Sequence, residues 1–560
     1  MPQKGKWPCV QFFHPFLAIG ARPGYFPAPM SQYRVLVADP ISEKGVDALR
    51  TSPAITVDVN TGLKLEALLA IIGDYHGLVV RSQTKVTAEV FAAAKNLKAV
   101  GRAGVGVDNI DRVAATEHGV VVMNTPSGNT ISTAEHAFTL MLSLARNIPQ
   151  AHASILAGKW DRKSFEGIEL FGKRLAVIGM GRIGTEFAKR AQAFGMTVIA
   201  YDPFLTAARA QSLKVELAES VADALTGADV VTLHIPLTPE TKHLLNCERL
   251  SLMNRGALVI NCARGGLVDE LAAKDLLDSG HLAGIALDVY ETEPPTAEFP
   301  LLAAKKCVFT PHLGASTAEA QENVGTEVAH QLRDFLVTGE IRNAVNMPNL
   351  DSHTLESVGP YLNLASSLGK LLSRIAPEQC DAIRVSYLGP VSELDTELIT
   401  RTVLTGYLSG AHTEANLNLV NAPAIAKAHG IQVSEATAAL ATNCTELIEV
   451  SAIKGVETCT VAGTFFGSSA RIVHIAGHYV ETNPRGRFLF VENDDRPGIV
   501  GTIGTALGNA AVNIANMALS RTQDRTRAVT VMEVDSPPPA QLLEQLRTTP
   551  GILRVLSFDL

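Results

Sequence analysis

A glycine-rich turn, Gly179-Met180-Gly181-Arg182-Ile183-Gly184, constrains the fold of this chain more than any other feature. Alone, a G-x-G-x-x-G pattern is weak, because glycine-rich turns are common. Here the apolar stretch LAVIG runs into it, the helical stretch RIGTEFAKRAQAFG begins within it, and a second apolar stretch, TVIAYDP, follows. This strand–turn–helix–strand order is the context that a dinucleotide-binding unit requires.

The residues of this turn have separate roles in such a unit. Gly179 allows the tight turn, Gly181 lets the backbone approach a pyrophosphate, and Gly184 permits close packing of the helix. The helix begins at Arg182 and Ile183, where unpaired N–H groups and partial positive charge attract phosphates. We therefore expect all five residues to lie against the dinucleotide.

Asp202 ends the strand that follows the helix. A carboxylate at this place accepts hydrogen bonds from both ribose hydroxyls and repels a 2′-phosphate, so it predicts NAD rather than NADP. The alternative is an aspartate that only begins a turn before Pro203.

Short apolar strands alternate with polar helical stretches well beyond this unit. Residues 33–123 contain the strands YRVLVAD, ITVDV, GLVVRS, LKAVGRAG and GVVVMN, and a second alternating region runs from LAVIGMG to about Thr310. The alternation predicts an α/β fold with two doubly wound parallel-sheet domains, Rossmann-like or flavodoxin-like. Ligands of such sheets lie at the carboxyl ends of strands, where the strand order reverses. Arg81 and Arg102, which end two strands, are therefore candidate ligand contacts, although either could be a solvated loop charge.

Helical spacing and capping patterns predict two connecting helices. The stretch from Ser132 to Trp160 begins like a capping box, with Ser132 or Thr133 followed by Glu135, and Ser316-x-x-Glu319 opens a second, long helix. The segments AVNMPNL at 344–350 and ETNPRGR at 481–487 indicate boundaries. Between them the chain alternates helix and strand without a catalytic cluster, and the remainder has the order β-α-β-β-α-β.

Composition limits the class of protein. With 560 residues the chain is too long for one core and should hold three or four domains. Its net charge of −8, without a basic stripe, argues against a nucleic-acid partner. No apolar run reaches the ~20 residues that cross a bilayer. Seven scattered cysteines without C-x-x-C spacing argue against a disulfide framework or a metal site, and favour a reducing cytoplasm.

Residues 1–30 differ from the rest of the chain. They carry Lys4, Lys6 and Arg22, no acidic residue, and an apolar patch from Phe12 to Ile19. A targeting segment is one interpretation, but His14 and Pro15 interrupt the patch. The interpretation that we prefer is a disordered extension, or translation that begins at Met30.

Three polar residues stand where apolar strands end: Arg264 in LVINCARGGLVDE, Glu293 in ALDVYETEPP and His312 in VFTPHLGAST. Hydride transfer to a 2-keto acid needs a cation for the carboxylate and ketone, a proton donor, and a group that keeps this donor poised. Arginine, histidine and glutamate suit these roles in that order. Singly, Glu293 could be a loop acid and His312 a helix cap; together, after a nucleotide fingerprint, they predict an active site.

Six blocks together resemble the D-isomer-specific 2-hydroxyacid dehydrogenases, in the long form with an intervening and an ACT domain: GRAGVGVDNID, NTPSGNTISTAEH, VIGMGRIG, NCARGGLVDE, ALDVYETEPP and PHLGAST. The resemblance implies that Arg264, Glu293 and His312 are catalytic, with His312 as the acid and base. It also implies cofactor contacts from further residues, namely Cys262, Ala263, Arg264, Asp288, His312, Gly314 and Ala315.

The resemblance implies a substrate and a reaction as well. It places the substrate's carboxylate and phosphate near Arg81, Ser82, Arg102, Asn124 and Arg146, which agrees with the several cations that a phosphorylated 2-hydroxy acid needs. The implied reaction is the NAD-dependent oxidation of D-3-phosphoglycerate to 3-phosphohydroxypyruvate, the first step toward L-serine. The alternatives are a dehydrogenase for glycerate, glyoxylate or an aliphatic keto acid, an NAD-sensing binding protein, and an amino-acid sensor.

For the whole chain the resemblance implies a homotetramer with four kinds of unit. These are a split substrate-binding domain at 31–127 and 313–347, an NAD-binding domain at 128–312, an intervening domain at 348–483 and an ACT domain at 485–560. In the ACT domain, Asp495 and Asn513 are the candidate contacts for an effector such as L-serine. Asp495 stands where serine-sensitive relatives often have Asn, and the domain could instead serve only in assembly.

Overall fold

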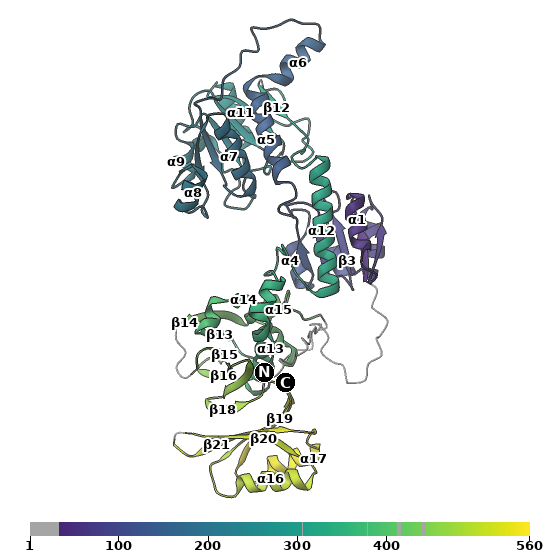
Figure 1. The fold of residues 1–560 in the computed structure, drawn as a ribbon, viewed down its shortest axis with the longest axis vertical. Coiled ribbons are helices and arrows are strands. Elements are labelled where there is room, and N and C mark those ends of the chain that lie inside the picture. The colour runs from purple at the N-terminus through teal and green to yellow at the C-terminus, as the bar shows by residue number, and fades with distance from the viewer. Residues whose placement is uncertain (1–32, 305, 378, 412–415, 439–443, 523) are drawn as a thin grey trace, which may run out of the picture.

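The computed structural model describes residues 33–304, 306–377, 379–411, 416–438, 444–522 and 524–560. The described residues form four sheets, which are spread along the long axis of the molecule (Figure 1). The sheet of residues 174–309 lies at one end, followed by those of residues 33–123, 382–482 and 487–559. The expectations for residues 1–30 lie outside the described part of the chain. Among the described residues, no helix combines the length and apolar character that crossing a membrane requires.

The first sheet is parallel, with strand order β2-β1-β3-β4-β5. Its strands are β1 (Tyr33–Val37), β2 (Ile55–Val59), β3 (Gly77–Val80), β4 (Ala99–Arg102) and β5 (Val121–Met123). The helical connections are α1 (Glu43–Arg50), α2 (Leu65–Ile71), the 3-10 turn η1 (Ile72–Asp74), α3 (Ala88–Ala93) and α4 (Arg112–Glu117). The order reverses between β1 and β3, so a ligand site is expected at their carboxyl ends.

A helix from much later in the sequence, α12 (Ala318–Thr338), completes this unit (Figure 1). Its side chains Val328 and Leu332 are fully buried in the same core as Val35 and Val79 of the sheet. Thr317 caps α12 by accepting a hydrogen bond from the Ala320 N–H. The long helix is thus confirmed, but the predicted capping box of Ser316 and Glu319 was wrong, because the N-cap is one residue later and Ala320 stands at the third helical position.

The second sheet has seven parallel strands in the order β12-β11-β10-β9-β6-β7-β8. Its strands are β6 (Arg174–Ile178), β7 (Thr197–Tyr201), β8 (Glu216–Leu217), β9 (Val230–Leu233), β10 (Ala257–Asn261), β11 (Leu282–Leu287) and β12 (Cys307–Phe309). The helices that follow β6 to β10 are α7 (Arg182–Ala193), α8 (Ala207–Leu213), α9 (Val221–Leu225), α10 (Cys247–Leu250) and α11 (Glu270–Asp278). This is the dinucleotide-binding order, with its reversal between β6 and β9.

The predicted helix after residue 132 is in fact two helices. α5 (Thr130–Ala145) begins two residues early without a side-chain cap, and α6 (Ile148–Leu156) follows it. Asn147 separates them in a left-handed conformation (φ 52°), and Pro149 stands in the first turn of α6. The spacing of apolar residues continued across this break, because a change of direction need not interrupt a helical pattern. The predicted capping box at Ser132 or Thr133 was wrong.

The third sheet is mixed, with the order β14-β13-β15-β16-β17-β18. Helices α13 (Ser352–Ile375), α14 (Thr396–Ala411) and α15 (Ala422–Ala428), the 3-10 turn η2 (Pro390–Glu393) and strands β13 (Ala382–Leu388) and β14 (Gln432–Ala438) alternate, as predicted. The second half departs from the prediction, because β15 (Leu447–Lys454), β16 (Glu457–Phe466), β17 (Ser469–Ile475) and β18 (His478–Thr482) form an antiparallel meander without helices.

The last sheet confirms the predicted β-α-β-β-α-β order. It consists of β19 (Arg487–Asp494), α16 (Ile499–Asn509), β20 (Ile514–Arg521), β21 (Arg527–Val534), α17 (Ala540–Thr548) and β22 (Ile552–Asp559). Its antiparallel strand order is β20-β21-β19-β22. The predicted fold class is thus confirmed, while we keep the residue bounds of the four domains as a proposal.

Candidate active site

The glycine-rich turn follows β6 at the point where the second sheet reverses its order. Gly179 has φ 97°, and a Cβ there would lie 2.5 Å from the carbonyl oxygen of His234, so no other residue fits. Gly181 is the N-cap of α7 and makes no side-chain cap, which leaves the first N–H groups of α7, at Arg182 and Ile183, open to a ligand. An uncapped helix N-terminus fits the pyrophosphate of a dinucleotide.

Asp202 directly follows β7, and its two carboxylate oxygens are held by the backbone. Oδ2 accepts a hydrogen bond from the Met180 N–H (2.8 Å) and Oδ1 accepts one from the Phe204 N–H (2.8 Å). These bonds tie the carboxylate to the glycine-rich turn itself. The residues of the turn, the α7 N-terminus and Asp202 therefore fit a bound NAD.

Arg264 lies beyond the end of β10, and Asn261 fixes its backbone. The Asn261 side chain donates to the Arg264 carbonyl (2.8 Å) and accepts from the Ala263 N–H (3.0 Å). The guanidinium reaches across to the first sheet, where Nε donates to Asp108 (3.0 Å). It also packs against Gly106, since a Cβ there would lie 1.8 Å from its Nη2. Because Asp108 is 70% exposed, this ion pair contributes at most about 1 kcal/mol, and a substrate carboxylate can replace it.

His312 and Glu293 form a direct hydrogen-bonded pair. Nδ1 of His312 lies 2.9 Å from Oε2 of Glu293, and Glu293 is itself held through Oε1 by the Tyr290 N–H (3.1 Å). The bond to Glu293 raises the pKa of His312, and the nearby Arg264 opposes the shift. Burial alone would raise the pKa of Glu293, but the bond to His312 outweighs it and lowers that pKa. With Nδ1 engaged, Nε2 is the nitrogen left for a substrate.

Asp288 serves the turn that carries His312. Only 1% of the surface of Asp288 is exposed. Its carboxylate accepts hydrogen bonds from the Thr310 hydroxyl (2.6 Å), the Leu313 N–H (2.7 Å) and the Gly314 N–H (2.8 Å). The cofactor contact predicted for Asp288 stays a prediction; in the structure both of its carboxylate oxygens accept hydrogen bonds from the protein.

Two further guanidiniums lie on the first sheet beside Arg264. Arg102 ends β4, and burial together with Arg264 lowers its pKa to about 10. Burial also lowers the pKa of Arg81, which follows β3 and donates to the carbonyl of Pro40 (3.2 Å). Within the described part of the chain, Nε of Arg102 has no hydrogen-bond partner. Buried cations whose charge is not fully compensated favour an anionic ligand.

The remaining predicted residues lie at different distances from this centre. Asn124 donates to the Val105 carbonyl (2.5 Å) at the edge of the cleft, and Ser82 is exposed next to Arg81. Cys262 is buried behind Arg264, and Ala315 accepts a bond from the Gln321 side chain. Within one chain, Arg146 does not reach the site that Arg264 and His312 form. It ends α5, about 15 Å along the helix axis from the part of α5 that touches Asp288.

The two predicted effector contacts lie in the last sheet's domain and already have protein partners. Asp495 pairs with Arg521, and Asn513 donates to Asp535 (2.7 Å). An effector there has to compete with these bonds.

Sequence reasoning missed three polar residues at the cleft, Asp39, Asp108 and His136. Asp39 ends VLVAD and accepts hydrogen bonds from the Arg81 N–H (2.6 Å) and the Thr84 hydroxyl (2.6 Å), so it shapes the loop that presents Arg81. The strand-end rule that selected Arg81 also applies to Asp39. No comparable signal marked Asp108 or His136, because their partners are 156 and 152 residues away.

Comparison with known proteins defines the class of this fold and site. Residues 138–314 match the family described as "D-isomer specific 2-hydroxyacid dehydrogenase, NAD binding domain". Residues 357–476 match "D-3-phosphoglycerate dehydrogenase intervening domain", and residues 487–551 match "ACT domain". The protein is thus an NAD-dependent 2-hydroxyacid dehydrogenase.

Full-length relatives narrow this class. A D-3-phosphoglycerate dehydrogenase of Archaeoglobus fulgidus is 43% identical over 94% of this chain and 100% of its own length, and one of Bacillus subtilis is 40% identical over 94% and 100%. The chain belongs to the D-3-phosphoglycerate dehydrogenase family. Among solved structures, the TT0316 protein of Thermus thermophilus (38% identity) and a glyoxylate reductase of Paecilomyes thermophila (30%) each match 56% of this chain and 99% of their own, with TM-scores of 0.52.

Replacing Asp202 tests the ribose assignment. We expect Asp202→Ala to raise the ratio of NADPH to NADH efficiency by about tenfold or more, because the repulsion of a 2′-phosphate is lost. Steady-state kinetics with both cofactors measure the ratio. Asp223→Ala, which removes an exposed carboxylate of the same domain, is the control and should leave it unchanged; an equal ratio in both variants removes the assignment.

Glu293→Gln tests the tuning of His312. Since the hydrogen bond that His312 donates to Glu293 raises the pKa of His312, the variant should lower that pKa. The protonated imidazole then persists over a narrower range, so the alkaline limb of kcat/KM for keto-acid reduction should move to lower pH. Glu291→Gln is a matched control, because Glu291 pairs with His243 (3.1 Å) instead. Superimposable pH profiles for Glu293→Gln and the wild type would contradict the pairing.

Proposed function

We propose that the chain oxidises D-3-phosphoglycerate to 3-phosphohydroxypyruvate with NAD, the first step of L-serine biosynthesis. The observation that carries the substrate assignment is the convergence of three guanidiniums, Arg81, Arg102 and Arg264, next to the His312–Glu293 pair. A phosphorylated acid brings a carboxylate and a phosphate, and one cation could not neutralise both. Full-length relatives that are D-3-phosphoglycerate dehydrogenases support the assignment.

In the proposed mechanism each group has one task. The glycine-rich turn, the α7 N-terminus and Asp202 would hold NAD, which would supply the acceptor for the hydride from C2 of the substrate. The Arg264 guanidinium exchanges Asp108 for the substrate carboxylate and polarises the C2 oxygen. His312 takes the C2 hydroxyl proton on Nε2, and the Glu293 carboxylate stabilises the resulting imidazolium through Nδ1. Arg81 and Arg102 hold the phosphate from the first sheet.

A panel of substrates tests this function. We expect NADH oxidation with 3-phosphohydroxypyruvate to exceed that with hydroxypyruvate and glyoxylate in kcat/KM by about a hundredfold, the scale of lost charged hydrogen bonds. Arg264→Ala and His312→Ala should each lower kcat at least about a hundredfold. Arg209→Ala, which removes an exposed arginine of the NAD domain, should be neutral. Preference for an unphosphorylated keto acid would refute the substrate, and near-normal turnover of either site variant would refute its role.

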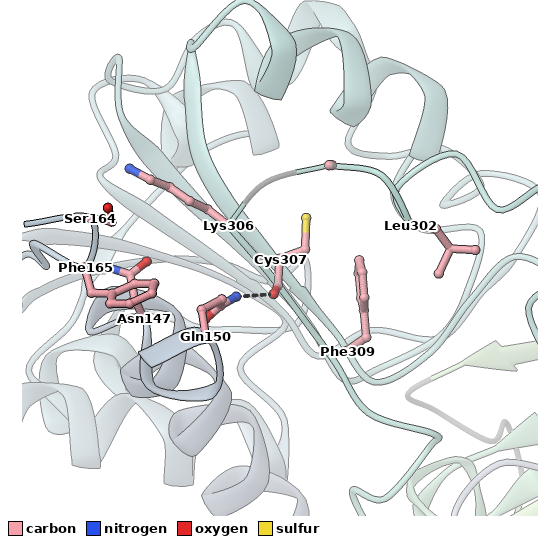
Figure 2. A pocket seen from close by; sticks show the side chains of 9 residues that line it. Asn147, Gln150, Ser164, Phe165, Leu302, Lys306, Cys307 and Phe309 are labelled. Carbon is pink, nitrogen blue, oxygen red and sulfur yellow. Dashed lines mark hydrogen bonds between the residues drawn. The ribbon is translucent and has the colours of Figure 1, made fainter. Parts of the chain in front are cut away.

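We also propose that the chain assembles as a homotetramer. Helix α6 buries none of its residues, and apolar side chains on it and just beyond it are exposed: Ile148 (55%), Ile155 (53%), Leu156 (75%) and Trp160 (82%). Next to α6 lies a cavity of about 480 Å³ that Phe165, Leu302 and Phe309 line (Figure 2). A second copy that covers this surface would bury it. Edge strand β20, with Met517 and Leu519 exposed, offers a second surface, and two surfaces suffice for four copies.

Light scattering after size exclusion tests the assembly. The wild type should have about four times the chain mass of 59.5 kDa. The double variant Leu156→Glu and Trp160→Glu should dissociate to smaller species, because it places charges on the α6 surface. Val456→Glu is the control, since Val456 is fully exposed on the turn between β15 and β16. A monomeric wild type would refute the proposal.

Finally, we propose L-serine as an effector of the ACT domain and the cytoplasm as the location. Gly498, in a left-handed conformation, caps α16 without a side chain, so backbone N–H groups there can receive a carboxylate. Asn513 would exchange Asp535 for the ligand.

The location that we propose, the cytoplasm, is a reducing compartment. Buried thiols such as Cys380, whose pKa is raised by burial, suit such a compartment.

The effector proposal predicts a response to serine. Millimolar L-serine should lower the activity at least about twofold, a coupling of modest size. Asn513→Ala should remove this response without changing the basal rate, since Asn513 lies in another domain than the catalytic residues. D-serine is the control ligand. The proposal fails if L-serine changes neither activity nor mass.

A further inference from the structure

The first turns of α5 lie against the loop that carries His312. The hydroxyls of Ser132 and Thr317 are 2.7 Å apart, and the Thr133 hydroxyl donates to the Gly314 carbonyl (3.2 Å). Ser132 and Thr133 stand where the chain enters the second sheet's domain, and Thr317 stands where it returns to the first. The two crossings between the domains are therefore bonded to each other beside the catalytic loop.

His136, one turn further along α5, contacts Asp288 and Thr310. Its Nε2 lies 3.1 Å from Oδ1 of Asp288 and 3.0 Å from the hydroxyl oxygen of Thr310. The Thr310 hydroxyl already donates its only hydrogen to Asp288 (2.6 Å). Both atoms facing Nε2 are thus acceptors, so Nε2 carries a hydrogen and donates it to them.

Asp288 connects this imidazole to the catalytic one. It is almost fully buried, and its bonds from the Leu313 and Gly314 N–H groups close the turn in which His312 adopts φ 54°. A non-glycine residue holds such a conformation only when its surroundings impose it. Burial would raise the pKa of Asp288, but the bonds from His136 and Thr310 outweigh this and lower it, so the carboxylate stays charged. A charged acceptor is the stronger anchor for the two N–H groups.

We propose that His136 is a positioning residue. By donating to the buried Asp288, it holds the turn of residues 312–314 in the strained conformation that aims the His312 imidazole at the substrate. This inference rests on the proposed role of His312 as the acid and base. His136 itself has no catalytic contact, because its Nε2 is used by Asp288 and Thr310 on the side of the loop that faces α5.

A pair of variants separates the hydrogen bond from the packing. His136→Phe keeps a ring of similar size and removes the donor, whereas the amide nitrogen of His136→Gln can reach the position of Nε2. With 3-phosphohydroxypyruvate and NADH we expect His136→Phe to lower kcat about tenfold or more, and His136→Gln to stay within about threefold of the wild type. KM for NADH should change less than about twofold in both. The isotope effect with NADH deuterated at the transferred position should rise in His136→Phe, because hydride transfer becomes slower than product release.

Thermal unfolding of both variants completes the test. Loss of kcat in His136→Phe, its recovery in His136→Gln and similar unfolding midpoints would support the positioning role. Wild-type kinetics in His136→Phe would overturn it, and so would equal losses in both variants that follow a lowered midpoint. A wild-type chain that reduces no 2-keto acid would refute the proposed function instead, and near-normal kcat in His312→Ala would refute the acid and base role on which this inference rests.

Discussion

The parallel arrangement of strands in the first two sheets is the constraint on which the rest of this protein depends. Strands of such a sheet are buried on both faces and have room only for apolar side chains. Groups with chemistry must therefore stand in the loops that follow the strands. In one sheet Arg81 follows β3 and Arg102 is the last residue of β4, while in the other Arg264 follows β10 and His312 follows β12. The ion pair of Arg264 with Asp108 shows that these two sets of loops meet.

Bringing several cations to one cleft has an electrostatic cost. The lowered pKa values of Arg81 and Arg102 reflect this cost. Burial disfavours the charged form of both, and repulsion from Arg264 and Arg81 lowers the pKa of Arg102 further. Asp39 and Asp108 offset part of this cost from within the first sheet's loops. The remainder is available to an anionic substrate, which gains more from cations that are already fixed and partly desolvated than from mobile ones in water.

His312 depends on a similar balance between opposing effects. Burial and Arg264 lower its pKa, but the hydrogen bond that it donates to Glu293 raises the pKa by more than they lower it. The backbone of the same residue is held in a left-handed turn by Asp288, which stands two residues before Tyr290, the anchor of Glu293, in the loop after β11. One short loop thus supports both the charge state and the orientation of the imidazole.

The sequence by itself determined the local features of this protein. Apolar runs located the strands of the first two sheets, the glycine pattern located the turn at Gly179, and strand ends identified Arg264, Glu293 and His312, since each signal lies within a few residues. It missed the break at Asn147, where apolar spacing continued across a change of helix direction. Only the tertiary structure decided the contacts between distant segments. Asp108 contacts Arg264 and His136 contacts Asp288 across more than 150 residues of sequence. Arg146 lies at the far end of α5. The packing of helices and sheets, and not the local sequence pattern, decides which loops share a cleft.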